Sequence, residues 1–192
     1  MLKGTNLVGG TGKNDRVDND FYATPPEATH SLFTVEKFDG LVWEPACGNG
    51  LMSEVIKIYN ETLSSDLIDR GYGTPNIDFL EADITQFGFS KCENIITNPP
   101  FSLFQDFAEK ALNIATKKVA LFGKLQALEG NKRNELWVNS PFKVIYVFKS
   151  RVNPLRNGSP VDDNGKKWCS TMAFAWFVWE KGYVGEPVIR WI

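Results

Sequence analysis

The chain has 192 residues, a length that suits one domain with its own hydrophobic core. Its composition is 43% hydrophobic and 23% charged, as in globular proteins. The sequence contains no run of eighteen apolar residues, the length that a membrane-spanning helix needs. Three widely spaced cysteines (Cys47, Cys92 and Cys169) and one histidine (His30) argue against a disulfide framework, a zinc site and a Ser-His-Asp triad. We therefore expect a cytoplasmic protein that needs no metal.

The net charge of −2 is unevenly distributed along the chain. Residues 1–114 carry 8 Lys and Arg against 17 Asp and Glu, whereas residues 115–192 carry 13 against 6. A basic second half can meet a phosphate backbone, but an ordinary solvated surface explains the same counts. Charge alone does not separate these interpretations.

Residues 1–20 lack periodicity, and we predict a flexible N-terminal segment. The GGTGKN sequence within them is not a phosphate-binding loop, because Leu7 and Asn14 stand where that motif requires Gly and Ser or Thr. From Thr24 onward the pattern is regular, and Thr24 with Glu27 resembles a capping box. The pattern of apolar residues and turn signals predicts four helices, over residues 24–38, 51–60, 102–116 and 126–138. It predicts strands over residues 41–44, 61–66, 78–83, 93–98, 119–124, 143–149 and 170–181, with 187–192 as a further edge strand.

This alternation predicts an α/β fold, a mostly parallel sheet with helices on both faces. In such sheets ligands bind beyond the carboxyl ends of the strands. We expect a single domain over residues 21–192, with one long irregular insertion at 150–168.

The first candidate site is residues 44–50 (EPACGNG), between a strand and a helix. Gly48 and Gly50 allow a ligand to lie on the turn, and the helix N-terminus beyond offers N–H groups to a carboxylate. Glu44, at the strand end, can accept from an amino group. These properties match the methionine moiety of S-adenosylmethionine. A structural strand-to-helix turn is the alternative.

Two further carboxylates end predicted strands. Asp66 is suited to ribose hydroxyls, and we prefer it to Asp69 because it directly ends the apolar run. Asp83 is suited to the adenine amino group, with Ile84 beside the ring. Each acid alone is more often a cap or a turn residue, but together they favour a nucleoside site.

The most specific feature is residues 98–101 (NPPF), directly after a predicted strand. The amide oxygen of Asn98 and the carbonyl of Pro99 can each accept an N–H of a planar amine, which exposes its lone pair to a methyl donor. Pro99 and Pro100 fix the turn, and Phe101 offers a face to a flipped-out base. The alternative is a helix-starting turn capped by Asn98.

These residues resemble the DNA adenine-N6 methyltransferases, amino-methyltransferases with an NPP[YF] motif, and their order is similar to the gamma arrangement. The resemblance is carried by TPPE (24–27), EPACGNG (44–50), Asp66, EAD (81–83) and NPPF (98–101). It implies a Rossmann-like class I methyltransferase domain with a seven-stranded sheet whose last strand is antiparallel. It also implies S-adenosylmethionine as donor, DNA as substrate and base flipping. The cofactor contacts would be Phe21, Tyr22, Thr24, Glu44, Pro45, Ala46, Cys47, Gly48, Gly50, Asp66, Asp83, Ile84 and Asn98.

The chain departs from the gamma enzymes after residue 125, because too little sequence remains for a large target-recognition domain. The 150–168 loop is the candidate DNA-reading element, although an ordinary loop is equally compatible. Together with Phe101, the expected nucleic-acid contacts are Lys124, Arg151, Arg156, Lys166 and Lys167. The compact plan is similar to small methyltransferases encoded by phages and prophages.

Two other functions fit the same residues. The same chemistry can act on an RNA base, on cytosine N4 or on a protein glutamine, because related enzymes share NPP[YF]. A non-catalytic nucleotide- or DNA-binding module could keep the fold. Cytosine C5 methylation is set aside, since its nucleophile follows a proline whereas Cys47 lies in the glycine turn.

Overall fold

The computed structural model describes residues 21–156, 158–161, 164–165 and 172–192. The predicted N-terminal segment, Cys169, Lys166 and Lys167 lie outside these ranges. Within the described part of the chain, no helix combines the length and apolar character needed to cross a membrane.

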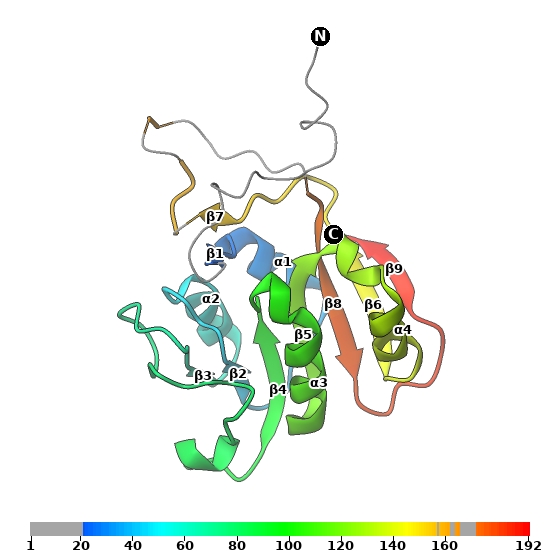
Figure 1. Cartoon of the computed structure of the whole chain (residues 1–192), viewed down its shortest axis with the longest axis horizontal. Helices are drawn as coiled ribbons and strands as arrows, with labels where there is room; N and C mark the ends of the chain where they lie inside the picture. Colours follow the sequence, from blue (N-terminus) through cyan, green and yellow to red (C-terminus); the bar gives the residue numbers. More distant parts are fainter. Residues whose placement is uncertain (1–20, 157, 162–163, 166–171) are drawn as a thin grey trace.

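A seven-stranded sheet forms the centre of the molecule, with strand order β3-β2-β4-β5-β8-β6-β9 (Figure 1). Strand β8 runs antiparallel to both its neighbours, and the other paired strands are parallel. The predicted fold class is confirmed; the antiparallel strand is β8, and the last strand of the chain, β9, lies parallel to β6. The strands are β2 Val42–Glu44, β3 Thr62–Ser64, β4 Cys92–Thr97, β5 Ala115–Lys124, β6 Phe142–Val147, β8 Phe174–Glu180 and β9 Val188–Trp191.

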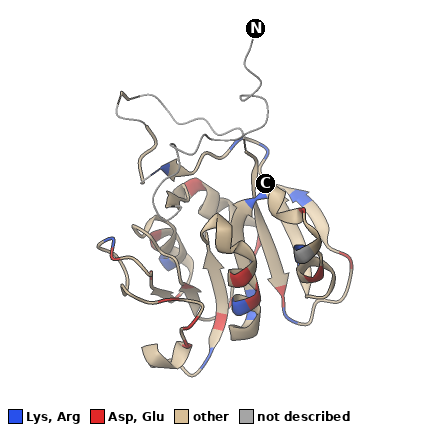
Figure 2. Cartoon of the chain, viewed as in Figure 1, with Lys and Arg blue, Asp and Glu red and all other residues tan. Residues whose placement is uncertain are grey.

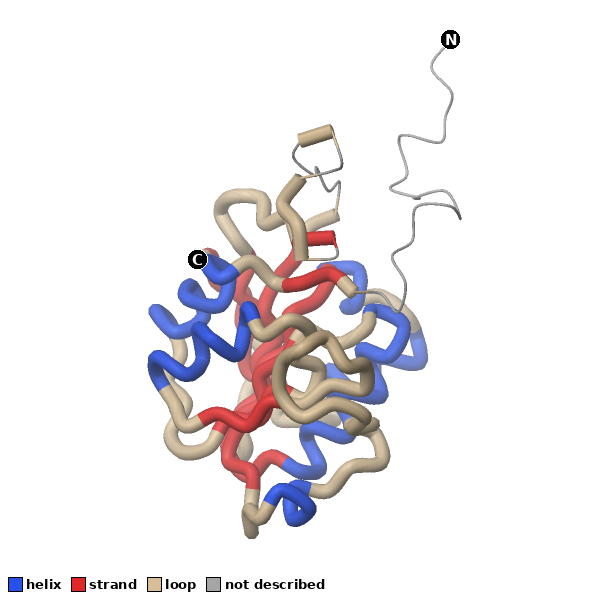
Figure 3. Tube along the Cα trace, turned by 90° about the vertical axis from the view of Figure 1, so that its left-hand side faces the viewer, coloured by secondary structure: helices blue, strands red, loops and turns tan. Residues whose placement is uncertain are grey.

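Helices cover both faces of this sheet, as the edge-on view shows (Figure 3). Helices α1 (Pro26–Val35) and α2 (Leu51–Tyr59) share one apolar core with the sheet, and α3 (Phe104–Ile114) and α4 (Asn131–Val138) share the other. Side chains of a strand alternate between faces, so β8 supplies both cores: Trp176 packs on the α1 side and Phe177 on the α3 side. The described residues also include three short 3₁₀ helices: η3 Ile84–Phe87, η4 Phe101–Leu103 and η5 Leu125–Leu128.

The strand predicted over residues 78–83 is wrong. These residues form a turn, in which the carboxylate of Asp78 accepts from the N–H of Leu80 and the carbonyl of Asp78 accepts from the N–H of Ala82. Phe79 is buried edge-on against Trp43, so its apolar character reflects core packing rather than strand pairing. The seventh strand is β9, at the opposite edge of the sheet.

The predicted capping box is also wrong. Helix α1 begins at Pro26, and its N-cap residue, Pro25, makes no side-chain cap. Thr24 is buried, and its hydroxyl has no hydrogen-bond partner among the described residues.

A separate two-stranded ladder lies beyond the main sheet, where β1 (Tyr22–Ala23) pairs antiparallel with β7 (Leu155–Arg156). In Figure 1 it lies at the end toward which the arrow of β4 points, which is the carboxyl edge of the parallel strands. The ladder therefore joins the start of the described chain to the 150–168 insertion directly above the edge where a ligand site is expected.

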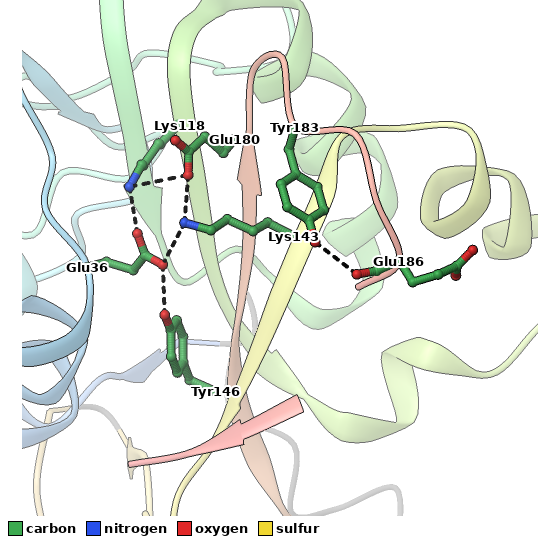
Figure 4. A network of polar contacts seen from close by, with 7 residues as sticks. All are labelled: Glu36, Lys118, Lys143, Tyr146, Glu180, Tyr183 and Glu186. Atoms are coloured by element: carbon green, nitrogen blue, oxygen red, sulfur yellow. Dashed lines mark hydrogen bonds and ion pairs between the residues drawn. The ribbon is translucent and has the colours of Figure 1, made fainter. Parts of the chain in front are cut away.

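A polar network around the buried carboxylate of Glu36 ties α1 to the sheet at the other end of these strands (Figure 4). Glu36, at the C-cap of α1, accepts from Lys118 (2.6 Å), from the hydroxyl of Tyr146 (2.7 Å) and from Lys143 (3.4 Å). Lys143 also donates to Glu180 on β8 at 2.7 Å. Burial alone would raise the pKa of Glu36, but the hydrogen bonds from Lys118 and Tyr146 and the two lysine charges hold it below its ordinary value.

Candidate active site

A cavity of about 620 Å³ opens at the carboxyl edge of the sheet. Four parts of the chain form its wall: residues 21–24, residues 44–52, residues 66–80 and residues 98–107. Most of the predicted cofactor residues line it: Phe21, Tyr22, Thr24, Glu44, Pro45, Ala46, Cys47, Gly48, Asp66 and Asn98.

The turn after β2 is shaped by Gly48. Its φ of +56° is in the left-handed region that favours glycine, and a Cβ there would lie 2.5 Å from Cε2 of Phe21. The ring of Phe21 therefore lies directly on the turn, and the guanidinium of Arg70 lies 4.4 Å from the ring centroid. Gly50 does not line the cavity: it is the left-handed N-cap of α2, and the ring of Tyr72 covers it. This corrects the prediction that Gly50 meets the ligand.

Asp66 fixes this turn from the end of the neighbouring strand. Its carboxylate accepts from the N–H of Gly48 at 2.7 Å and from the N–H of Ile68 at 2.8 Å. A carboxylate has about four lone-pair sites, so Asp66 can still accept from a ligand. Asp69 does not line the cavity and instead accepts from the N–H of Gly71.

Glu44 is an almost fully buried acid in the cavity wall, 2% exposed. Its carboxylate accepts from the hydroxyl of Ser53, which also shares a 2.6 Å hydrogen bond with Ser64. Burial, with a smaller contribution from the charge of Asp66, raises the pKa of Glu44 to about 8. Glu44 is therefore protonated at neutral pH, and a cationic group of a ligand beside it would lower its pKa and favour the carboxylate.

Asn98 lines the same cavity, and only the nitrogen of its side-chain amide has a hydrogen-bond partner among the described residues. Its Nδ2 donates to the backbone carbonyl of Tyr22 at 2.7 Å. Because a carbonyl only accepts, this contact fixes which end of the amide is nitrogen. Its Oδ1 is buried and has no partner among the described residues. The side chain therefore presents a single hydrogen-bond acceptor.

Phe101 is covered in this structure. Its ring stacks with Tyr22 (centroids 5.4 Å apart, planes at 26°) and packs against Phe174 (5.9 Å). The ammonium of Lys124 lies 3.8 Å from its centroid. Phe101 does not line the cavity, so the predicted open stacking face is absent in this conformation.

Three other predicted residues lie outside the cavity: Pro99, Asp83 and Ile84. Asp83 is exposed and caps η3, where its side chain accepts from the N–H and the hydroxyl of Thr85. Ile84 is buried in the core beneath. Because 78–83 is a turn and not a strand, Asp83 does not reach the carboxyl edge, which corrects its predicted contact with adenine.

The thiol of Cys47 is buried in the cavity wall beside two acids. Burial raises its pKa to about 12, together with the carboxylates of Glu44, which is ionised above about pH 8, and Asp66, so the thiol is protonated at neutral pH. This agrees with setting aside cytosine C5 chemistry.

Basic residues of the second half gather near the site. Lys124 ends β5, Arg151 lies beside a second cavity of about 570 Å³, and Arg156 pairs with Tyr22 in the ladder. Figure 2 shows Lys and Arg on β7 and along the segment that joins it to β6.

Sequence reasoning missed the wall formed by residues 67–80, including Arg70 and Asp78. The segment has no periodicity that would place it. Asp78 begins the DFLEAD stretch that ends at Asp83, and of these two acids it is Asp78 that lines the cavity.

The cavity fits S-adenosylmethionine on its own chemistry. Its volume is within the usual range of about 300–1,000 Å³ for small-ligand sites. Glu44 would accept from the ligand's amine and Asp66 from the ribose hydroxyls. The unpartnered hydroxyl of Thr24 and the glycine turn offer further polar contacts.

Comparisons with solved structures agree with the fold. A type I restriction-modification methyltransferase subunit from Streptococcus thermophilus matches with a TM-score of 0.61 and 13% identity over 88% of this chain and 47% of its own. A candidate RNA methyltransferase from Pyrococcus horikoshii gives 0.62 and 15%, over 94% and 99%. The M protein of the type I restriction enzyme EcoKI gives 0.56 and 14%, over 90% and 46%. The chain thus spans about half the length of the two restriction-modification subunits.

No curated protein sequence matches the chain. A family model does: that of the adenine-specific methyltransferase EcoRI aligns with residues 73–180, more than half of the chain, including Asn98 and Phe101. The resemblance inferred from the sequence motifs is thereby confirmed, and the protein belongs to the EcoRI family of adenine-specific methyltransferases.

Proposed function

We propose that the chain transfers a methyl group from S-adenosylmethionine to the exocyclic N6 amine of adenine in DNA. The observation that carries this proposal is the buried, unpartnered Oδ1 of Asn98, a residue that lines the cavity together with Glu44 and Asp66. When bound, the cofactor supplies an electrophilic methyl group. Glu44, Asp66 and Thr24 would hold it, and the ring of Phe21 would keep water from the glycine turn.

Asn98 acts on the acceptor amine. Its Oδ1 accepts one N–H, while the hydrogen bond from Nδ2 to the carbonyl of Tyr22 keeps the amide from rotating. The carbonyl of Pro99 remains the predicted acceptor for the second N–H. Two acceptors draw the amine out of conjugation with the ring and leave its lone pair exposed. An acceptor fixed before the substrate arrives requires no reorganisation during methyl transfer.

DNA is the acceptor that the family and the charges favour. The family is described as adenine-specific, Lys124 ends β5 at the carboxyl edge, and Arg156 belongs to the ladder beyond that edge. The likeness to the Pyrococcus protein, which covers almost all of that chain, favours RNA as the second candidate.

The test is transfer of a labelled methyl group. The protein is incubated with methyl-labelled S-adenosylmethionine and DNA, RNA or protein, and the digests are analysed by mass spectrometry. We expect label in N6-methyldeoxyadenosine, and loss of transfer by Asn98→Ala with cofactor binding retained. If the label is found only in RNA nucleosides, cytosine or glutamine, the methyl acceptor is that group and not adenine in DNA. Cofactor binding without any methyl transfer would indicate a binding module.

A further inference from the structure

Two adjacent aromatic residues, Phe21 and Tyr22, point toward different parts of the site. Phe21 lies against Gly48 and beneath Arg70, on the glycine turn. Tyr22 stacks on Phe101, in the NPPF motif. Successive side chains of an extended segment point in opposite directions, so one short segment reaches two ligand positions.

Resting on the proposed function, we propose that Tyr22 serves the target base and not the cofactor: its ring is the second stacking face, opposite Phe101. Tyr22 and Lys124 together cover Phe101, so a base reaches that ring only by displacing one of them. Tyr22 lines the cavity faced by Asn98, whereas Lys124 does not. In the absence of DNA, the ring of Tyr22 therefore occupies the place on Phe101 where the target base would stack.

The two rings are supported differently. Phe101 packs against Phe174 and the core beneath it, which fixes its position. Tyr22 is half-buried and belongs to a two-residue ladder outside the main sheet. A base between two rings needs about 7 Å between their planes, since each stacked contact takes about 3.5 Å. The centroids are now 5.4 Å apart, so the rings have to separate before a base can enter. Because Phe101 is held by the core, we expect the ring of Tyr22 to move.

The backbone of Tyr22 can stay in place during this movement. Its carbonyl accepts from Nδ2 of Asn98, and its strand pairing with Arg156 fixes the peptide on the other side. Rotation about side-chain torsions opens the stack without breaking either contact. Tyr22 thus holds Asn98 through its main chain and would hold the base through its ring.

The experiment uses an oligonucleotide with 2-aminopurine at the adenine that label transfer identifies, and S-adenosylhomocysteine as cofactor analogue. Fluorescence rises when 2-aminopurine leaves the DNA stack and is quenched when aromatic rings enclose it. We expect Tyr22→Ala to give brighter flipped 2-aminopurine and a single-turnover rate about ten- to a hundredfold lower, because one stacked contact is lost. Its affinity for S-adenosylhomocysteine should not change, and Tyr22→Phe should restore both signals.

Phe21→Ala is the matched control: it should weaken S-adenosylhomocysteine binding and leave the 2-aminopurine signal unchanged. Should Tyr22→Ala instead weaken the cofactor analogue and leave the fluorescence at the wild-type level, Tyr22 is a cofactor residue and the inference is overturned. A Lys124→Ala variant that alone brightens the flipped base would overturn it as well. Absence of methyl transfer by the wild-type protein would overturn the proposed function together with this inference.

Discussion

The N–H of Gly48 donates a 2.7 Å hydrogen bond to the carboxylate of Asp66, which joins the glycine turn after β2 to the end of β3. Asp66 is buried and also accepts from Ile68, so one side chain fixes two loops of the cofactor cavity. We expect Asp66→Ala to lower the free energy of unfolding by about 2 kcal/mol, since two backbone donors lose a charged acceptor.

The same change should weaken S-adenosylmethionine binding more than tenfold, about 1.4 kcal/mol, because the turn and a ribose acceptor are both lost. Calorimetric titration and urea unfolding measure the two effects. Asp69→Ala is the control, since Asp69 accepts from Gly71 outside the cavity. Equal effects of the two substitutions would contradict this assignment.

The raised pKa of Glu44 leads us to expect that the protein releases a proton when the cofactor binds. Its pKa of about 8 means that the carboxyl holds its proton at neutral pH in the free protein. A cationic amine beside it favours the carboxylate, so binding at about pH 7 should release up to one proton and affinity should rise with pH up to about 8. Titration calorimetry in two buffers of different ionisation enthalpy measures the release. Glu44→Gln should abolish it, and proton release that persists in this variant would assign it to another group.

The same raised pKa affects stability in the free protein. Because the folded protein holds the Glu44 proton more tightly than the unfolded chain does, Glu44 contributes its full stabilisation at pH values below 4.5. This contribution is lost as pH rises through about 8. Wild-type protein should therefore lose stability relative to Glu44→Gln between these two pH values. Urea unfolding across this range measures the difference, and parallel profiles would mean that Glu44 ionises normally.

Much of the fold follows from local patterns. Residues 170–181 were predicted as a long apolar strand, and β8 is Phe174–Glu180. Glu44 was predicted at the site because it ends a buried strand, and Asn98 because it begins the NPPF motif directly after one. The turn at 78–83 was misassigned because a short apolar run bounded by acids has the same appearance in a strand and in a packed turn.

The contacts that complete the site are tertiary and could not be read from the pattern. The ladder joins Tyr22 to Arg156, 134 positions later, and two-residue strands carry no periodicity. The covering of Phe101 depends on that ladder, because Tyr22 supplies the ring. The NPPF motif predicted what Phe101 can bind, but not that a neighbour already occupies its face.

Gly48→Ala tests the contact between the glycine turn and Phe21. Gly48 and Gly71 both have positive φ, so an alanine at either position costs about 1 kcal/mol of backbone strain. Only at Gly48 would the new Cβ meet a ring, at 2.5 Å from Phe21, whereas nothing lies within 4 Å at Gly71. We expect similar losses of stability but weaker S-adenosylmethionine binding for Gly48→Ala alone, measured by thermal unfolding and calorimetry. Unchanged affinity in Gly48→Ala would mean that Phe21 does not contact the cofactor.

The network around Glu36 predicts how stability depends on pH. Because the pKa of Glu36 is lowered in the folded protein, its contribution is present above the ordinary value of 4.5 and is lost as pH falls through the folded pKa. Glu36→Gln leaves Lys118 and Lys143 without their buried anion, and we expect a loss of about 3 kcal/mol at neutral pH. The difference from wild type should shrink as pH falls below 4.5, because wild-type Glu36 becomes protonated at its lowered pKa. Urea unfolding at several pH values measures it, with Glu54→Gln as control because Glu54 pairs with Lys57 on the exposed face of α2. A difference that stays constant with pH would mean that Glu36 acts through packing and not through charge.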